Sequence, residues 1–240
     1  MKNTYFITGT DTDAGKTLIT TALLFKAKKE GLRTLGLKPI AAGFELACDG
    51  TAKHSDDGVP QNDDAVALLR HATVELSYQQ INPQIFKAAT SPHIAAQKEN
   101  KRIDVDRLVG LVRGSLSYSY DLALIEGAGG LLVPLNERHT VADLIAALNC
   151  PVILTIGLKL GCLNHSLLTY EVLSRRGIKI AGWIGTELHA DMPYFEENIA
   201  TLRSWIAAPC LGTVRYAPDD QFSNETDRLS HICEQLVLPS

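Results

Sequence analysis

The chain is 240 residues long, with 45% hydrophobic and 21% charged residues, a composition typical of a soluble globular protein. A formal net charge of −4 argues against a general nucleic-acid binder, and no apolar run reaches the ~18–20 residues of a membrane span. The length predicts one α/β domain over residues 1–240 that buries its core without disulfides. The five cysteines are scattered, so we expect free thiols in a cytoplasmic protein.

Short apolar runs alternate with longer amphipathic stretches along the chain. The apolar runs predict strands covered on both faces, as in a parallel sheet, at residues 4–8, 34–37, 122–125, 152–156, 178–184 and 210–214. The amphipathic stretches predict helices at residues 16–29, 63–71, 104–115, 141–148, 164–175, 194–206 and 225–236. This alternation predicts a doubly wound, mostly parallel sheet with helices on both faces. Residues 44–61, rich in Gly, Asp, Ser and Pro, predict a long loop.

A glycine-rich segment, Gly9 to Thr17 (GTDTDAGKT), joins the first predicted strand to the first predicted helix. Backbone N–H groups in such a turn, together with the helix N-terminus, favour phosphate. Lys16 is then expected to reach the β- and γ-phosphates, and the Thr17 hydroxyl to ligate Mg²⁺. The first glycine lies one residue further from Gly15 than the strict phosphate-loop pattern requires. The context still predicts a P-loop NTPase-like fold, and the absence of an N-K-x-D motif favours ATP over GTP.

Two charged residues follow neighbouring predicted strands. Glu126 comes directly after residues 122–125 and precedes a run of glycines, and Lys38 comes directly after residues 34–37. Because ligands of open α/β sheets bind at the carboxyl ends of strands, we expect both side chains near the phosphate loop. There the carboxylate suits a Mg²⁺-nucleotide site and the lysine suits stabilisation of anionic charge. The alternatives are a surface glutamate before a flexible turn and an exposed lysine at a strand end.

Six segments together resemble one family, the dethiobiotin synthetases. In chain order they are GTDTDAGKT at 9–17, KPIAAG at 38–43, NDDAVAL at 62–68, TSPHIAA at 90–96, IEGAGG at 125–130 and GLKLGCLNH at 157–165. The resemblance covers residues 1 to about 212. It implies an ATP- and Mg²⁺-dependent enzyme of biotin biosynthesis that joins CO2 to 7,8-diaminononanoate. The implied intermediates are a carbamate and a carbamic–phosphoric anhydride, which closes to a cyclic urea.

The resemblance also implies roles for individual residues. Lys38 and Lys16 become catalytic, and Thr17, Asp64 and Glu126 become ligands of Mg²⁺. Without the resemblance, Asp64 is an acidic residue in the first turn of a helix, where the helix dipole favours it. The implied ATP-binding residues are Asp13, Ala14, Gly15, Lys16, Thr17, Leu18, Asp64, Glu126, Gly127, Ala128 and Gly129.

For the second substrate the resemblance implies a site shared by two subunits of a homodimer. Ser91 belongs to its substrate loop, although the same residues also fit a helix start with Ser91 as cap and Pro92 in the first turn. The resemblance also implies that the substrate carboxylate meets a helix N-terminus contributed by the partner subunit, and the matching segment here, Gly161 to Asn164, contains Cys162 and Asn164. The alternative for Asn164 is a simple N-cap.

Three departures from the family pattern concern contacts with ligands. Ala42 stands where the family often has a substrate-binding hydroxyl. Thr186 and Glu187 stand where the family usually reads adenine with Asn-Asp, and a hydroxyl offers fewer hydrogen bonds than an amide. In the segment after residue 214, where the family often has a proline-containing loop, Arg215 or Tyr216 is a candidate to stack on a base.

Two rival interpretations remain. Partition and septum-positioning ATPases share this architecture and act as nucleotide-switched dimers, but they carry an additional lysine where this chain has Asp11. A basic DNA-facing stripe and a basic C-terminal membrane helix are also missing from the sequence. The second rival is a family member that binds nucleotide without catalysis, for which Ala42 and Thr186 are the only indications. We therefore expect no nucleic-acid or membrane partner.

Overall fold

The computed structural model describes residues 3–44, 53–56 and 58–239. Of the loop predicted at 44–61, residues 45–52 and 57 lie outside this described part. Its described remainder contains an isolated antiparallel bridge between His54 and Pro60.

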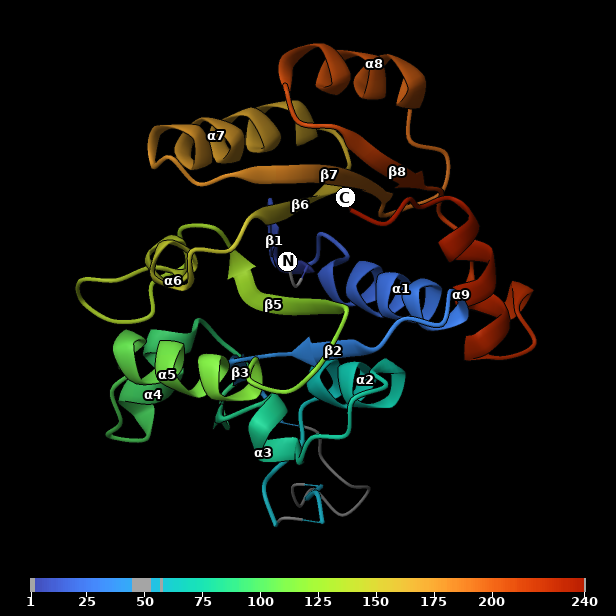
Figure 1. The fold of residues 1–240 in the computed structure, drawn as a ribbon. Coiled ribbons are helices and arrows are strands. Elements are labelled where there is room, and N and C mark those ends of the chain that lie inside the picture. The colour runs from blue at the N-terminus through green and yellow to red at the C-terminus, as the bar shows by residue number, and fades with distance from the viewer. Residues whose placement is uncertain (1–2, 45–52, 57, 240) are drawn as a thin grey trace.

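A central sheet of six parallel strands forms the middle layer of the described chain, in the order β2-β5-β1-β6-β7-β8 (Figure 1). Since β1 pairs with β5 on one side and with β6 on the other, the topology changes direction at β1. Ligands of open α/β sheets bind at such a switch point, beyond the carboxyl ends of the strands. The strands are β1 (Asn3–Gly9), β2 (Thr34–Leu37), β5 (Leu122–Gly130), β6 (Val152–Leu158), β7 (Ile180–Glu187) and β8 (Cys210–Val214).

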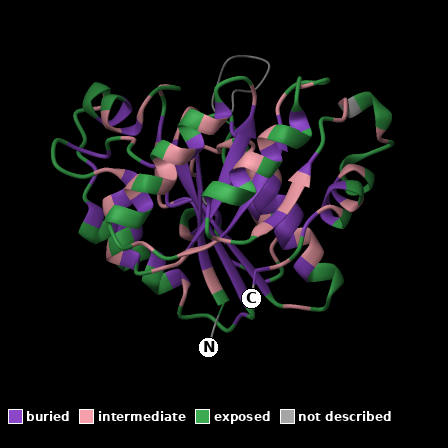
Figure 2. Ribbon diagram, turned by 90° about the horizontal axis from the view of Figure 1, so that it is seen from above, coloured by how far each residue is buried: buried purple, intermediate pink, exposed green. Residues whose placement is uncertain are grey.

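Helices cover both faces of this sheet. Alternate residues of β1 point to opposite faces, so Ile7 packs beneath α1 (Lys16–Lys29) and α9 (Glu225–Glu234), whereas Phe6 belongs to the other hydrophobic core. That second face is covered by α5 (Val105–Ser115), α6 (Val141–Leu148), α7 (Cys162–Arg175) and α8 (Phe195–Trp205). Figure 2 shows the buried residues concentrated along the central strands. The predicted doubly wound architecture is confirmed.

Several predicted elements have different ends in the structure. The strand predicted at 122–125 is longer in the structure, because β5 continues to Gly130, which pairs with Gly9 of β1. Strand β6 ends at Leu158, and β7 runs from Ile180 to Glu187. Helix α7 begins two residues before its predicted start, with Gly161 as N-cap, so Asn164 is not the cap. Helix α5 begins one residue later because the Asp104 side chain caps it, and α8 and α9 are each two residues shorter than predicted.

Four short elements were not predicted. Strands β3 (Ile40–Ala42) and β4 (Gln84–Phe86) form a separate parallel pair. In the chain, β3 precedes α2 (Asp63–His71) and β4 precedes α4 (Pro92–Lys98). A four-residue helix, α3 (Tyr78–Ile81), and a single 3₁₀ turn, η1 (Asp219–Gln221), complete the set. Segments of three or four residues are too short to carry a hydrophobic period. Within the described residues, the helices are too short or too polar to traverse a bilayer.

Candidate active site

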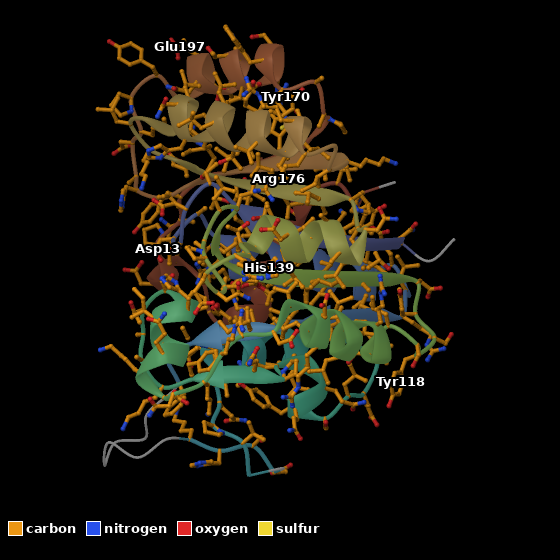
Figure 3. The ribbon with its side chains drawn as sticks, turned by 90° about the vertical axis from the view of Figure 1, so that its left-hand side faces the viewer. Asp13, Tyr118, His139, Tyr170, Arg176 and Glu197 are labelled. Atoms are coloured by element: carbon orange, nitrogen blue, oxygen red, sulfur yellow. The ribbon has the colours of Figure 1, made fainter. Side chains whose placement is uncertain are left out.

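The phosphate loop lies between the end of β1 and the start of α1. Gly15 is the N-cap of α1 and has a φ of 87°, a left-handed conformation that favours glycine. The Lys16 ammonium is buried and donates to the backbone oxygens of Asp11 at 2.8 Å and Thr12 at 2.7 Å. Figure 3 places Asp13 of this loop and Tyr118, which precedes β5, at opposite ends of the molecule. The loop therefore lies at the carboxyl ends of the strands.

Two lysines of like charge share this region, and their environments push their pKa values in opposite directions. The pKa of Lys16 is lowered to about 8. Burial is the larger cause, and the neighbouring Lys38 ammonium is the second. Burial also lowers the pKa of Lys38, but Glu126 and Asp64 together outweigh burial and raise it above its ordinary value. Lys38 is therefore a permanent cation at neutral pH, and Lys16 is the lysine that phosphate would stabilise most.

Lys38 joins the carboxylates of two different elements. Its ammonium donates to Glu126 Oε1 at 2.6 Å and lies 2.8 Å from Asp64 Oδ2. Glu126 is wholly buried within β5, and only 4% of the Lys38 side chain is exposed. A buried charge is tolerated only when an opposite charge and hydrogen bonds compensate it. This cluster agrees with the prediction that Lys38 and Glu126 lie close together at the strand ends. The alternatives of a surface glutamate and an exposed strand-end lysine are wrong, because both side chains are buried.

Asp64 and Thr17 complete the cluster. Asn62 caps α2, and the helix then begins at Asp63 and carries Asp64 in its first turn, where it faces the start of α1. The Thr17 hydroxyl lies 2.8 Å from Asp64 Oδ1 and 2.9 Å from Glu126 Oε1. Burial raises the pKa of Asp64, but Lys38 and Thr17 outweigh it, so this pKa lies below its ordinary value. The cluster thus contains two carboxylates, one hydroxyl and one ammonium.

The oxygens of this cluster fit a hard divalent cation. Mg²⁺ prefers oxygen ligands and usually keeps water or substrate phosphate oxygens in its coordination shell. Glu126 Oε2 is buried and finds no hydrogen-bond partner among the described residues. No group of three or more His, Cys, Asp or Glu side chains suited to a metal occurs in the described ranges. Thr17, Asp64 and Glu126 are therefore suited to a magnesium ion that arrives with phosphate oxygens, rather than to a closed structural metal site.

A cavity of about 510 Å³, here called the β7 cavity, opens on one side of the phosphate loop. The Thr186 hydroxyl is buried at its wall without a hydrogen-bond partner among the described residues. Arg215 lies over the ring of Phe195, 3.8 Å from its centre, so one face of its guanidinium is already covered. The lining residues are Gly15, Leu18, Thr186, Glu187, Leu188, Val214, Arg215, Tyr216, Ala217, Pro218, Asp220, Phe222, Arg228 and Ile232.

A second cavity of about 410 Å³, here called the β3 cavity, opens beside Lys38. Ser91 lies at its wall and its hydroxyl is 3.0 Å from His93 Nδ1. Ser91 is also the N-cap of α4, with Pro92 at the first helical position, although its side chain makes no capping hydrogen bond. The lining residues are Thr12, Lys38, Ala41, Ala42, Asn62, Asp64, Ala89, Thr90, Ser91, Pro92, Ala128, Gly129 and Val133.

The structure brings most of the predicted site residues together around these two cavities. Asn62 was not predicted as a site residue, yet it lines the β3 cavity and donates to the Gly43 backbone oxygen at 2.9 Å. Its position just before two acidic residues was the available signal, because Asn is a common N-cap. Gly127 lies within β5 beside Lys38, which donates to its backbone oxygen at 3.2 Å. Ala14 is buried behind the loop, and Asp13 is exposed.

Cys162 and Asn164 lie apart from both cavities within the single chain. Cys162 is the first residue of α7, its side chain is buried, and its backbone N–H donates to the Lys159 oxygen at 2.9 Å. Asn164, in the first turn of α7, is exposed. The assignment of these residues to a substrate carboxylate therefore depends on a second subunit and stays a prediction.

Comparisons with known proteins identify relatives along nearly the whole chain. A family model described as an AAA domain matches residues 3–223. A curated ATP-dependent dethiobiotin synthetase BioD from Cellvibrio japonicus (strain Ueda107) is 50% identical over 213 residues, 89% of each chain. Another, from Yersinia pestis bv. Antiqua (strain Angola), is 41% identical over 240 residues, 99% of this chain and 96% of that protein.

Solved structures show the same fold at low sequence identity. The cell division ATPase MinD of Pyrococcus furiosus is 16% identical, with a TM-score of 0.53 and 98% of both chains covered. A ParA family ATPase from Chlorobium tepidum TLS is 15% identical, with a TM-score of 0.52 over 97% of this chain and 90% of that one. These likenesses confirm the P-loop NTPase-like architecture and concern the fold alone.

Proposed function

Because this chain belongs to the family of ATP-dependent dethiobiotin synthetases, we propose that it forms dethiobiotin from 7,8-diaminononanoate, CO2 and ATP in biotin biosynthesis. The observation that carries the proposal is the buried cluster of Lys38, Asp64 and Glu126. Lys38 and Asp64 line the β3 cavity, and Gly15 and Leu18, on either side of Lys16 and Thr17, line the β7 cavity. A reaction between a nucleotide phosphate and a second substrate needs two such compartments that meet at a charged centre. We propose that the protein works in the cytoplasm as a homodimer.

ATP is proposed to bind with its phosphates on the loop and its base in the β7 cavity. Backbone N–H groups at the start of α1 favour the phosphates, and no acidic residue occupies the first turn of this described helix. Thr17, Asp64 and Glu126 would hold Mg²⁺, which when bound neutralises phosphate charge. The full set of proposed ATP-binding residues is Asp13, Ala14, Gly15, Lys16, Thr17, Leu18, Asp64, Glu126, Gly127, Ala128 and Gly129.

The proposed chemistry has three steps. One substrate amine adds to CO2 and loses a proton, which gives a carbamate. A carbamate oxygen then attacks the γ-phosphorus, ADP leaves, and a carbamic–phosphoric anhydride forms. The second amine attacks the anhydride carbonyl, phosphate leaves, and the ring closes. Lys38 and Lys16 are proposed to stabilise the negative charge on the carbamate and on the transferred phosphoryl group, since both ammonium groups are buried at the loop.

The diamine is proposed to bind in the β3 cavity, with Ser91 at its wall. Ala42 lines the same cavity and offers no hydroxyl, so the amide of Asn62 and the backbone supply the polar contacts there. In the proposed homodimer the substrate carboxylate meets the start of α7 of the partner subunit, where Cys162 contributes backbone and Asn164 contributes an exposed side chain.

Replacement of Asn164 by Ala tests this shared site. We expect the KM for the diamine to rise about 10- to 100-fold while the KM for ATP stays within about twofold, because a lost hydrogen bond to a charged group costs about 1.5–3 kcal/mol. Steady-state kinetics with each substrate varied in turn measures both constants. Thr169→Ala, on the same helix, is the matched control. An unchanged diamine KM in Asn164→Ala contradicts the assignment of the substrate carboxylate to α7.

The proposed function itself is tested by phosphate release from MgATP with and without 7,8-diaminononanoate and bicarbonate. We expect release to require the diamine and Mg²⁺, and mass spectrometry to detect one cyclic urea per phosphate. GTP and CTP are run in parallel, because the single hydroxyl of Thr186 distinguishes bases less sharply than an amide does. Hydrolysis without the diamine would favour a nucleotide switch, and nucleotide binding without hydrolysis would favour an inactive family member.

A further inference from the structure

Glu187, the last residue of β7, binds two separate loops through its two carboxylate oxygens. Oε1 accepts the Met192 backbone N–H at 3.1 Å, from the segment between β7 and α8. Oε2 accepts the Tyr216 backbone N–H at 3.0 Å, from the segment that follows β8. The two segments are more than twenty residues apart in sequence, and this one side chain holds both against the end of β7.

The Glu187 carboxylate is also buried and paired with a positive charge. Only 4% of the Glu187 side chain is exposed, and a carboxylate that is buried so deeply needs compensation. Arg215 lies 3.5 Å from Oε2, and its guanidinium covers the ring of Phe195 at the start of α8. The carboxylate thus connects β7, α8 and the segment after β8 through hydrogen bonds, an ion pair and a cation–π contact.

The elements that Glu187 connects are walls of the β7 cavity. Tyr216, Ala217 and Pro218 line one side, and Gly15 and Leu18 of the phosphate loop line it as well. The neighbouring Thr186 hydroxyl lies at the same wall, is buried, and has no hydrogen-bond partner among the described residues.

We propose that Glu187 is a positioning residue for the nucleobase. It holds the wall formed by residues 216–218 at a fixed distance from the phosphate loop, so that a flat heteroaromatic base fits between them. Glu187 does not itself contact the nucleotide, since its oxygens are occupied by Met192, Tyr216 and Arg215. This inference rests on the proposed ATP-dependent function.

The proposal separates binding of the base from binding of the phosphates. In Glu187→Gln, an amide NH2 replaces one oxygen, so one loop N–H loses its acceptor and Arg215 loses its counter-charge. We expect the Kd for ADP to rise about 10- to 100-fold, because a charge-assisted hydrogen bond is lost. Inorganic tripolyphosphate, which has no base, is expected to bind both proteins equally. At saturating ATP, kcat and the diamine KM are expected to stay within twofold.

Calorimetric titration of the full chain with ADP and with tripolyphosphate decides the question without any need for dethiobiotin synthesis. Glu197→Gln, at an exposed position on α8, is the matched control and should bind both ligands like the wild type. Should Glu187→Gln fold poorly, Glu187→Asp keeps the charge but is one methylene too short to reach both loops, and it should weaken ADP alone. An unchanged ADP Kd, or equal weakening of ADP and tripolyphosphate, overturns the proposal.

Discussion

Replacement of Lys38 by Gln is expected to lower dethiobiotin formation at least about a hundredfold, which is the typical effect of removing one preorganised group that stabilises transition-state charge. The structural reason is that the Lys38 ammonium is held by Glu126 and Asp64 within hydrogen-bonding distance. It is therefore fixed in place before substrate arrives, and no other cation contacts both carboxylates among the described residues. Turnover is measured as cyclic urea formed at saturating ATP and diamine.

The same replacement also removes the counter-charge of a wholly buried carboxylate. Breaking a buried ion pair by removal of one partner typically costs about 3–5 kcal/mol, so we expect the free energy of unfolding to fall by about that amount in urea titrations. The double variant Lys38→Gln/Glu126→Gln removes both charges, and we expect it to regain most of that stability without regaining activity. The comparison of the single and double variants thus separates the role of Lys38 in stability from its role in catalysis. Near wild-type turnover in the single variant would remove Lys38 from the mechanism.

The central sheet was predictable because its strands are covered on both faces. Runs such as Leu122–Ile125 are apolar throughout, and the helices between them have clear periodicity. The predicted strand stopped before Gly127, Gly129 and Gly130, since glycine is rare within strands. They extend β5 here because Gly130 pairs with Gly9, and because a side chain at Gly127 would lie 2.9 Å from the Phe6 ring. Only the tertiary packing reveals that requirement.

The site was predictable in part for a topological reason. Lys38 and Glu126 follow or end the buried apolar runs of adjacent strands, and the carboxyl ends of parallel strands meet at one edge of the sheet. Asp64 was inferred only through the family resemblance, because an acidic residue in the first turn of a helix has an ordinary structural explanation. The contacts of Glu187 come from loops without any periodic pattern, so sequence reasoning did not find them.

Replacement of Gly15 by Ala is expected to weaken ADP binding at least about a hundredfold. A residue with a side chain pays about 1–2 kcal/mol in the left-handed conformation that Gly15 adopts, with φ at 87°. A Cβ atom there would also lie 2.9 Å from Thr186 Cγ2, and Thr186 belongs to the buried strand β7, which cannot easily move. The phosphate loop must shift instead, and its N–H groups then no longer point to the phosphates.

Gly31→Ala is the control that isolates the steric contribution. Gly31 has a similar φ of 79°, but an added Cβ there meets nothing within 4 Å. We therefore expect Gly31→Ala to lose only about 1–2 kcal/mol of stability and to bind ADP normally. Thr186→Ser removes the contacting methyl group, so Gly15→Ala/Thr186→Ser should regain part of the lost affinity. Recovery of affinity in the double variant would locate the defect at the contact between the loop and β7. If Gly15→Ala binds ADP like the wild type in calorimetric titrations, the loop does not hold phosphate as proposed.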